Sequence, residues 1–132
     1  MPKIRHIAYR SQDPEALARF FVEAFEMEIA ERRPSGAIDL SDGTMNITVL
    51  PMAPRTADGR EVRPGIDHMG FTVEDTEEAR QRLLAAGARE LNTINSGSAH
   101  YEVKFAGPEG IVVDVGHWAG TAPLPEKAAA RA

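Results

Sequence analysis

Two histidines occupy the same place in two similar segments of the chain, and they are the side chains with the clearest capacity for chemistry. His6 stands in the segment Ile4-Arg5-His6-Ile7-Ala8, and His68 stands 62 residues later in Ile66-Asp67-His68-Met69-Gly70. Each segment continues through an acidic turn into a helical pattern. Imidazole nitrogens are good ligands for first-row divalent metals. One histidine in each copy of an internal repeat therefore predicts a site that the two halves share.

The last strand predicted in each half adds an oxygen donor. Asn46 and Asp114 lie in these strands, each among small or apolar neighbours. If a pseudo-two-fold axis relates the halves, both oxygen donors and both imidazoles can converge on one point. Two imidazoles with one carboxylate and open positions suit a divalent ion of Fe, Mn, Ni or Zn. The candidate metal ligands are His6, His68 and Asp114.

Strand alternation predicts which side chains share a face with the histidines. We expect His6 to lie on the face of Ile4, and His68 on the face of Ile66, opposite the face that a helix covers. A lone histidine on a half-buried strand is commonly structural, and asparagine or aspartate near a strand end commonly belongs to a turn. The recurrence of the histidine at equivalent repeat positions favours metal binding.

The elements that must position these side chains follow the same order in each half. The first half (about residues 3–50) predicts a strand, a helix that begins at Pro14 and ends near Glu26, and three more strands. A polar loop follows at 51–64. The second half (about 65–118) repeats the order, with Thr76 as the expected helix cap. The predicted strands are 4–11, 27–33, 37–40, 45–50, 66–73, 90–94, 101–106 and 111–116.

This pattern predicts an α+β fold, in which two βαβββ repeats form a curled, mainly antiparallel sheet around a concave site. The two helices should cover the outside of the sheet. We expect Phe20 and Phe21 to pack on the side of Ile7 and Tyr9. Leu83 and Leu84 should pack in the same way on the side of Met69 and Phe71.

Length and composition limit the classes of protein that this chain can represent. With 132 residues and 42% hydrophobic content, one domain is expected over 1–120, followed by a tail at 121–132. The net charge of −5 disfavours nucleic-acid and anionic-membrane partners. No cysteine is present, which excludes thiolate ligands and a thiol nucleophile. No apolar stretch approaches the roughly 18 residues of a membrane helix, so a cytoplasmic protein is expected.

The repeated order of elements and three stretches resemble the vicinal oxygen chelate superfamily. This superfamily contains glyoxalase I, methylmalonyl-CoA epimerase, extradiol dioxygenases, fosfomycin-resistance enzymes and bleomycin-binding proteins. The resemblance covers roughly residues 3–118. The stretches that carry it are His6-Ile7-Ala8 with Asp13-Pro14, the run Asp67-His68-Met69-Gly70-Phe71-Thr72-Val73, and the run Gly107-Pro108-Glu109-Gly110-Ile111-Val112-Val113-Asp114.

The resemblance implies a glyoxalase-type ligand set at His6, Asn46, His68 and Asp114. Glyoxalases typically have glutamates at the second and fourth of these positions. Asn46 is neutral, so it cannot act as the base that abstracts a substrate proton, and we assign it the role of orienting bound water or substrate. The expected activity is that of a metal-dependent lyase or isomerase that acts on a small substrate with vicinal oxygens.

Two other functions remain open. Two histidines and one carboxylate are also the Fe(II) ligands of extradiol dioxygenases, although the tyrosine typical of those enzymes falls on Lys104. His100 could then serve as an acid or base, or it could be a polar residue at a strand end, and His117 is expected on a surface or an interface. The third reading is a drug- or metabolite-binding protein of the bleomycin-resistance type. The resemblance also implies a homodimer.

Overall fold

The structure is a computed structural model, and it describes residues 1–56, 59–95, 101–116, 118–119 and 122–123. One eight-stranded sheet has the order β2-β3-β4-β1-β5-β8-β7-β6, and each half of the chain supplies four adjacent strands. The first half contains β1 (Lys3–Ser11), α1 (Pro14–Phe25), β2 (Glu28–Arg32), β3 (Ile38–Ser41) and β4 (Asn46–Pro51). The predicted α+β fold with two βαβββ repeats is confirmed.

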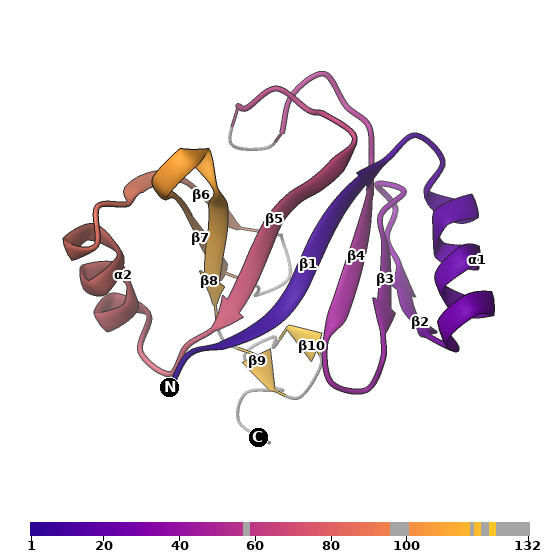
Figure 1. Cartoon of the computed structure of the whole chain (residues 1–132), viewed down its shortest axis with the longest axis horizontal. Coiled ribbons are helices and arrows are strands. Elements are labelled where there is room, and N and C mark those ends of the chain that lie inside the picture. Colours follow the sequence, from indigo (N-terminus) through magenta and orange to yellow (C-terminus); the bar gives the residue numbers. More distant parts are fainter. Residues whose placement is uncertain (57–58, 96–100, 117, 120–121, 124–132) are drawn as a thin grey trace.

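The second half contains the same order of elements with one short addition. It comprises β5 (Gly65–Thr72), α2 (Thr76–Ala85), β6 (Arg89–Asn95), β7 (Tyr101–Ala106), the 3-10 turn η1 (Pro108–Gly110) and β8 (Val112–Gly116). Beyond the sheet, β9 (Trp118–Ala119) pairs with β10 (Ala122–Pro123). Figure 1 shows α1 and α2 at opposite ends of the sheet, with β1 and β5 side by side between them. No helix in the described ranges is both long and apolar enough to cross a membrane.

Both helices begin at an aspartate that caps the first turn. The Asp13 carboxylate accepts a hydrogen bond from Ala16 N at 3.1 Å, and Pro14 follows in the first turn. The Asp75 carboxylate accepts from Glu78 N at 3.0 Å. The expectation that Thr76 caps the second helix is therefore wrong, since the longer cap side chain one residue earlier reaches the free backbone N–H group.

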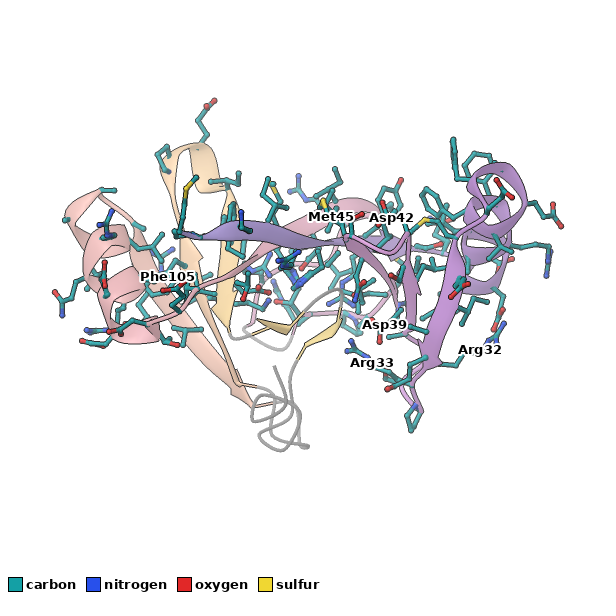
Figure 2. All side chains as sticks on the ribbon, turned by 90° about the horizontal axis from the view of Figure 1, so that it is seen from below. Arg32, Arg33, Asp39, Asp42, Met45 and Phe105 are labelled. Carbon is teal, nitrogen blue, oxygen red and sulfur yellow. The ribbon has the colours of Figure 1, made fainter. Side chains whose placement is uncertain are left out.

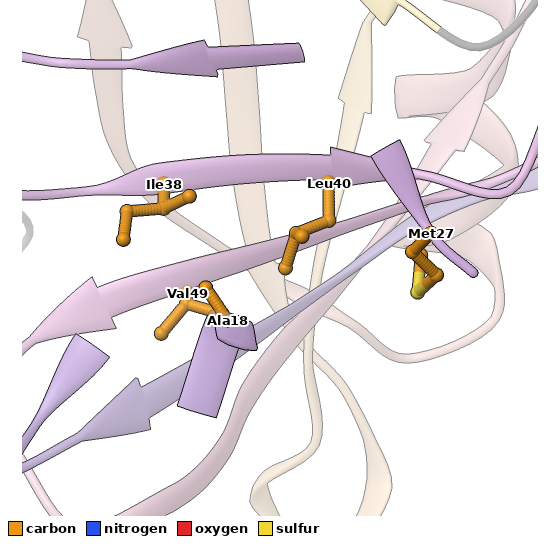
Figure 3. Packing of buried hydrophobic residues seen from close by; sticks show 5 residues of the cluster. All are labelled: Ala18, Met27, Ile38, Leu40 and Val49. Carbon is orange, nitrogen blue, oxygen red and sulfur yellow. The ribbon is translucent and has the colours of Figure 1, made fainter. Parts of the chain in front are cut away.

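Each helix packs on its own half of the sheet. The buried cluster under α1 contains apolar side chains from the helix, from β3 and β4 and from the segment after the helix: Ala18, Met27, Ile38, Leu40 and Val49 (Figure 3). The cluster at α2 contains Val73, Val103, Phe105 and Val115. Burial of apolar area of this kind is the main favourable term that fixes each helix to the sheet.

The predicted helix faces are correct only in part. Phe21 and Leu83 pack against the two clusters. Phe20 is 54% exposed and Leu84 is 38% exposed, because each helix turns a narrower face to the sheet than the apolar pattern suggested. The helix α1 contacts β3 and β4 more than β1, so Ile38 and Val49 take the place that was expected for Ile7 and Tyr9.

The two halves join through antiparallel pairing of β1 with β5. In this pairing His6 lies opposite Gly70, and Ala8 lies opposite His68. Each histidine therefore lies opposite a residue with no side chain or only a methyl group, which leaves room for the imidazole beside the neighbouring strand.

Two β-bulges interrupt this pairing, each one residue before a histidine. On β1, the pairing skips one residue between Ile4 and His6, while their partners on β5 are consecutive. On β5, it skips one residue between His68 and Ile66, while their partners on β1 are consecutive. Arg5 and Asp67 are the extra residues. A bulge breaks the alternation of side chains, so the prediction that Ile4 and Ile66 share the histidine face is wrong, and these side chains are 41% and 68% exposed.

Candidate metal centre

Three strands that are neighbours in the sheet bring together His6, His68 and Asp114. Their ligand atoms all lie within 4.8 Å of one another, and all three residues are buried. The carboxylate is central, because Asp114 Oδ2 lies 3.4 Å from His6 Nε2 and 3.0 Å from His68 Nε2. The two imidazole rings meet edge to face with centroids 5.4 Å apart. The three predicted ligands, which lie on β1, β5 and β8, therefore come together at one site.

Asp114 is a carboxylate in this environment although its side chain is fully buried. Burial alone would raise the pKa of the Asp114 carboxyl. Hydrogen bonds with His6 and His68, together with the positive charge of Lys104, outweigh burial and hold this pKa well below its ordinary value of 3.8. The site therefore keeps a negatively charged oxygen ligand at its centre.

The bulge residue Asp67 orients the second histidine. Its Oδ2 lies 2.6 Å from His68 Nδ1, so we assign the neutral ring a proton on Nδ1, which leaves the lone pair of Nε2 directed at the site. Arg60 Nη2 and Arg10 Nε lie 3.4 and 3.8 Å from the Asp67 carboxylate and balance its charge. A carboxylate behind an imidazole is the arrangement that fixes a metal-binding histidine.

Protonation of His68 responds to the same contacts. Burial would lower the pKa of His68, whereas hydrogen bonds to Asp114 and Asp67 raise it, and the net shift is upward from 6.5. Since a histidine must be neutral to bind a metal, protons compete with metal at this site as the pH falls.

Lys104 on β7 reaches into the same cluster. Its Nζ lies 3.0 Å from Asp114 Oδ2 and 3.2 Å from His68 Nε2, and the residue is 4% exposed. The ammonium group thus bridges two of the atoms that the sequence predicts as metal ligands.

The donor set and the space around it fit a divalent metal ion. Gly70 lies beneath the site, where an added Cβ would overlap the His6 ring and stand 2.6 Å from Asp114 Oδ1. This second carboxylate oxygen is buried, and among the described residues no hydrogen-bond donor reaches it. Two imidazoles, a carboxylate with an available oxygen and an absent side chain at Gly70 together suit a metal of the first transition row.

The strand register identifies Thr48 as the first-half counterpart of Asp114. Asp114 lies opposite Gly70, two residues after His68, and Thr48 lies opposite Ala8, two residues after His6. The Thr48 hydroxyl donates to Asp39 Oδ1 at 2.8 Å. The Asp39 carboxylate in turn accepts two hydrogen bonds from the Arg33 guanidinium. Figure 2 labels both side chains, which lie next to each other. The site therefore carries one carboxylate where a symmetric site would carry two.

Asn46 lies directly opposite His6 in the β1–β4 register. It is buried, and its Oδ1 receives no hydrogen bond from the described part of the chain. Its assignment as an orienting residue stays a prediction. The residues His100 and His117 lie outside the described residues, so their predicted roles stay open.

Two residues at the site were not assigned to it from the sequence, although Lys104 was noted as the position on which the dioxygenase tyrosine falls. Alternation placed Asp67 on the face opposite His68, and no pattern in the sequence marks the bulge that moves it. Lys104 had a usable signal: it is a charged residue between Val103 and Phe105, which pack in the α2 cluster, so alternation puts Lys104 on the site face.

A model of the glyoxalase-like domain family matches residues 6–116. The chain belongs to this family. The resemblance to the vicinal oxygen chelate superfamily is thereby confirmed, and the matched range includes all three residues of the triad. No curated protein matches the chain by sequence.

Solved structures with this fold include enzymes of different activity. The methylmalonyl-CoA epimerase of Mycobacterium tuberculosis aligns with a TM-score of 0.69 and 17% identity over 96% of this chain and 91% of that one. A 2,3-dioxygenase from Pseudomonas sp. KL28 has a TM-score of 0.69 and 18% identity, with 96% of this chain and 47% of that one covered. The Mn(II)-bound glyoxalase of Novosphingobium aromaticivorans has a TM-score of 0.65 and 16% identity, with 87% and 37% covered. At these identities the likeness shows the fold alone.

The charge of Asp67 predicts a pH-dependent stability. Burial would raise the pKa of Asp67, but the His68 hydrogen bond and the charges of His68, Arg60 and Arg10 outweigh it and lower the pKa to about 2 from 3.8. A lowered pKa stabilises the folded state above pH 3.8, and this contribution disappears as the pH falls toward 2. We expect Asp67→Asn to lower the free energy of unfolding at neutral pH by about 1–3 kcal/mol.

The difference between wild type and Asp67→Asn should shrink as the pH is lowered from 3.8 toward 2, as measured by urea unfolding. Asp13→Asn is the matched control, because Asp13 is exposed and asparagine caps a helix equally well. A difference that is the same at all pH values would contradict the role given to the Asp67 charge.

Proposed function

We propose that this protein is a metal-dependent lyase or isomerase of the glyoxalase-like family that acts on a small substrate with vicinal oxygens. The observation that carries the proposal is the buried triad of His6, His68 and Asp114, whose ligand atoms lie within 4.8 Å of one another. A divalent metal held there would supply a Lewis acid for two adjacent substrate oxygens.

The chain's own residues have distinct parts in this proposal. Asp114 provides the negative ligand, and Asp67 keeps the lone pair of His68 Nε2 directed at the site. Gly70 leaves open the space that a side chain would fill. Asn46 orients bound water or substrate through its amide. The burial of the triad excludes bulk water, which strengthens electrostatic interactions within the site.

A ring-cleaving dioxygenase is the second candidate, and one observation favours it. Thr48 stands at the register position that corresponds to Asp114, and its hydroxyl is engaged by Asp39. The site thus offers two imidazoles and one carboxylate, the ligand set typical of non-haem Fe(II) oxygenases. Neither Thr48, at the register position, nor Asn46, at the position that the resemblance implies, supplies a second carboxylate as a proton-abstracting base.

Turnover assays distinguish these functions. Protein loaded with Fe(II), Mn, Ni or Zn is tested with 2-oxoaldehyde hemithioacetals, acyl-CoA epimers and catechols. We expect metal-dependent conversion of one of the first two substrate classes. That activity should be absent in Asp114→Ala and retained in Asp13→Asn.

Oxygen consumption with ring cleavage of a catechol would contradict the lyase or isomerase and support the dioxygenase. Tight binding of a ligand without turnover of any substrate, and without a metal requirement, would contradict both enzymes and favour a binding protein.

We also propose that the protein is a homodimer. Phe20 and Phe25 form an exposed aromatic patch on α1 with ring centroids 6.0 Å apart, and Phe25 is 64% exposed. Exposed apolar patches commonly mark protein contacts. Light scattering at micromolar concentration should report twice the mass of the chain. A monomer would contradict the dimer and leave the metal site unaffected.

A further inference from the structure

Lys104 is a buried cation within the proposed ligand set. Its Cα lies opposite that of Asp114 in the β7–β8 pairing. Its neighbours Val103 and Phe105 pack in the α2 cluster, so alternation turns the lysine to the opposite, site-facing side of the sheet. The strand pairing therefore directs this ammonium group to the carboxylate that the two histidines also approach.

The ammonium group uses the lone pairs that a metal would need. Nζ contacts Asp114 Oδ2 at 3.0 Å and His68 Nε2 at 3.2 Å, while these two acceptors are themselves 3.0 Å apart. While His68 is neutral with its proton on Nδ1, Nε2 and Asp114 Oδ2 are both acceptors, and the lysine supplies the hydrogen atoms to both. Only the protonated ring donates from Nε2 to Asp114, and in that form His68 cannot bind a metal. A divalent ion that binds these two atoms must displace Nζ.

A divalent ion on Asp114 would leave the tethered ammonium group near the site, where it no longer pairs with that carboxylate. Lys104 neutralises Asp114 when no metal is bound, and a divalent ion on the same carboxylate adds positive charge that the described carboxylates at the site do not match. The Asp67 carboxylate does not compensate, since Arg10 and Arg60 already balance it. An excess of buried charge is costly unless an opposite charge enters the site.

We propose that the Lys104 ammonium group competes with the divalent metal for Asp114 and His68. Once the metal is bound, the same ammonium group selects anionic substrates with vicinal oxygens. This inference rests on the proposed metal-dependent function and narrows its substrate class to chelating anions. Lys104 is thus a specificity-determining residue whose side chain is tethered to β7 and flexible enough to move from Asp114 to a substrate oxygen.

Metal affinity tests the competition directly. Protein freed of metal with a chelator is titrated with Mn²⁺ by calorimetry. We expect Lys104→Met to bind Mn²⁺ at least tenfold more tightly than wild type, because the length-matched apolar side chain no longer occupies Asp114 Oδ2. Lys3→Met is the matched control, since Lys3 is exposed, and it should bind like wild type. Lys104→Gln, a polar neutral variant, serves if Lys104→Met fails to fold by circular dichroism.

Oxalate, a small dianion with vicinal oxygens, tests the selection of anions. Titrated into the Mn²⁺-loaded proteins, it should bind wild type and Lys3→Met at least tenfold more tightly than Lys104→Met. Lys104→Arg, which keeps the positive charge, should recover part of this affinity. This readout does not depend on catalytic turnover.

Each outcome bears on a different part of the inference. Equal or weaker Mn²⁺ binding by Lys104→Met would overturn the competition and leave the metal site standing. Tighter Mn²⁺ binding with unchanged oxalate affinity would overturn the selection of anions. If folded wild type and folded Lys104→Met both fail to bind Mn²⁺, Fe(II), Ni²⁺ and Zn²⁺, the metal-dependent function itself fails, and the inference with it.

Discussion

The antiparallel pairing of β1 with β5 is the constraint on which the rest of the site depends. It joins the two repeats and sets His6 opposite Gly70 and His68 opposite Ala8. A shift of one residue would turn one imidazole to the opposite face of the sheet from the other. The bulge before each histidine fixes the register further, because an extra residue can be accommodated at few places along a pair. The repeat therefore supplies the histidines, and their pairing makes them one site.

The two halves differ at their bulge residues, although both contain the same order of elements. Asp67 accepts a hydrogen bond from His68 Nδ1 at 2.6 Å. Its counterpart Arg5 can only donate, and its Nη1 donates to the Thr44 carbonyl at 3.3 Å. In the same way Asp114 faces both histidines, whereas Thr48 turns its hydroxyl to Asp39. The second half thus supplies both carboxylates at the triad, Asp67 and Asp114, whereas the first half supplies the His6 imidazole and the Thr48 hydroxyl.

The features that repeat were predictable from the sequence, and those that break the repeat were not. The fold, the order of elements and the convergence of His6, His68 and Asp114 followed from two copies of one pattern, because apolar periodicity and turn residues determine strands and helices locally. The bulge at Asp67 depends on how two distant strands pair, which no local pattern records. Only the strand register identifies Thr48 as the counterpart of Asp114. The exposure of Phe20 likewise depends on how α1 packs on the sheet.

The central claim is that one divalent ion binds to His6, His68 and Asp114 together. Anomalous diffraction from crystals grown with Zn²⁺ tests it most directly, because the signal locates the metal without reference to activity. We expect one anomalous peak at about 2.0–2.2 Å from Nε2 of both histidines and from a carboxylate oxygen of Asp114. A peak elsewhere, or two imidazoles too far apart to share an ion, would contradict the account.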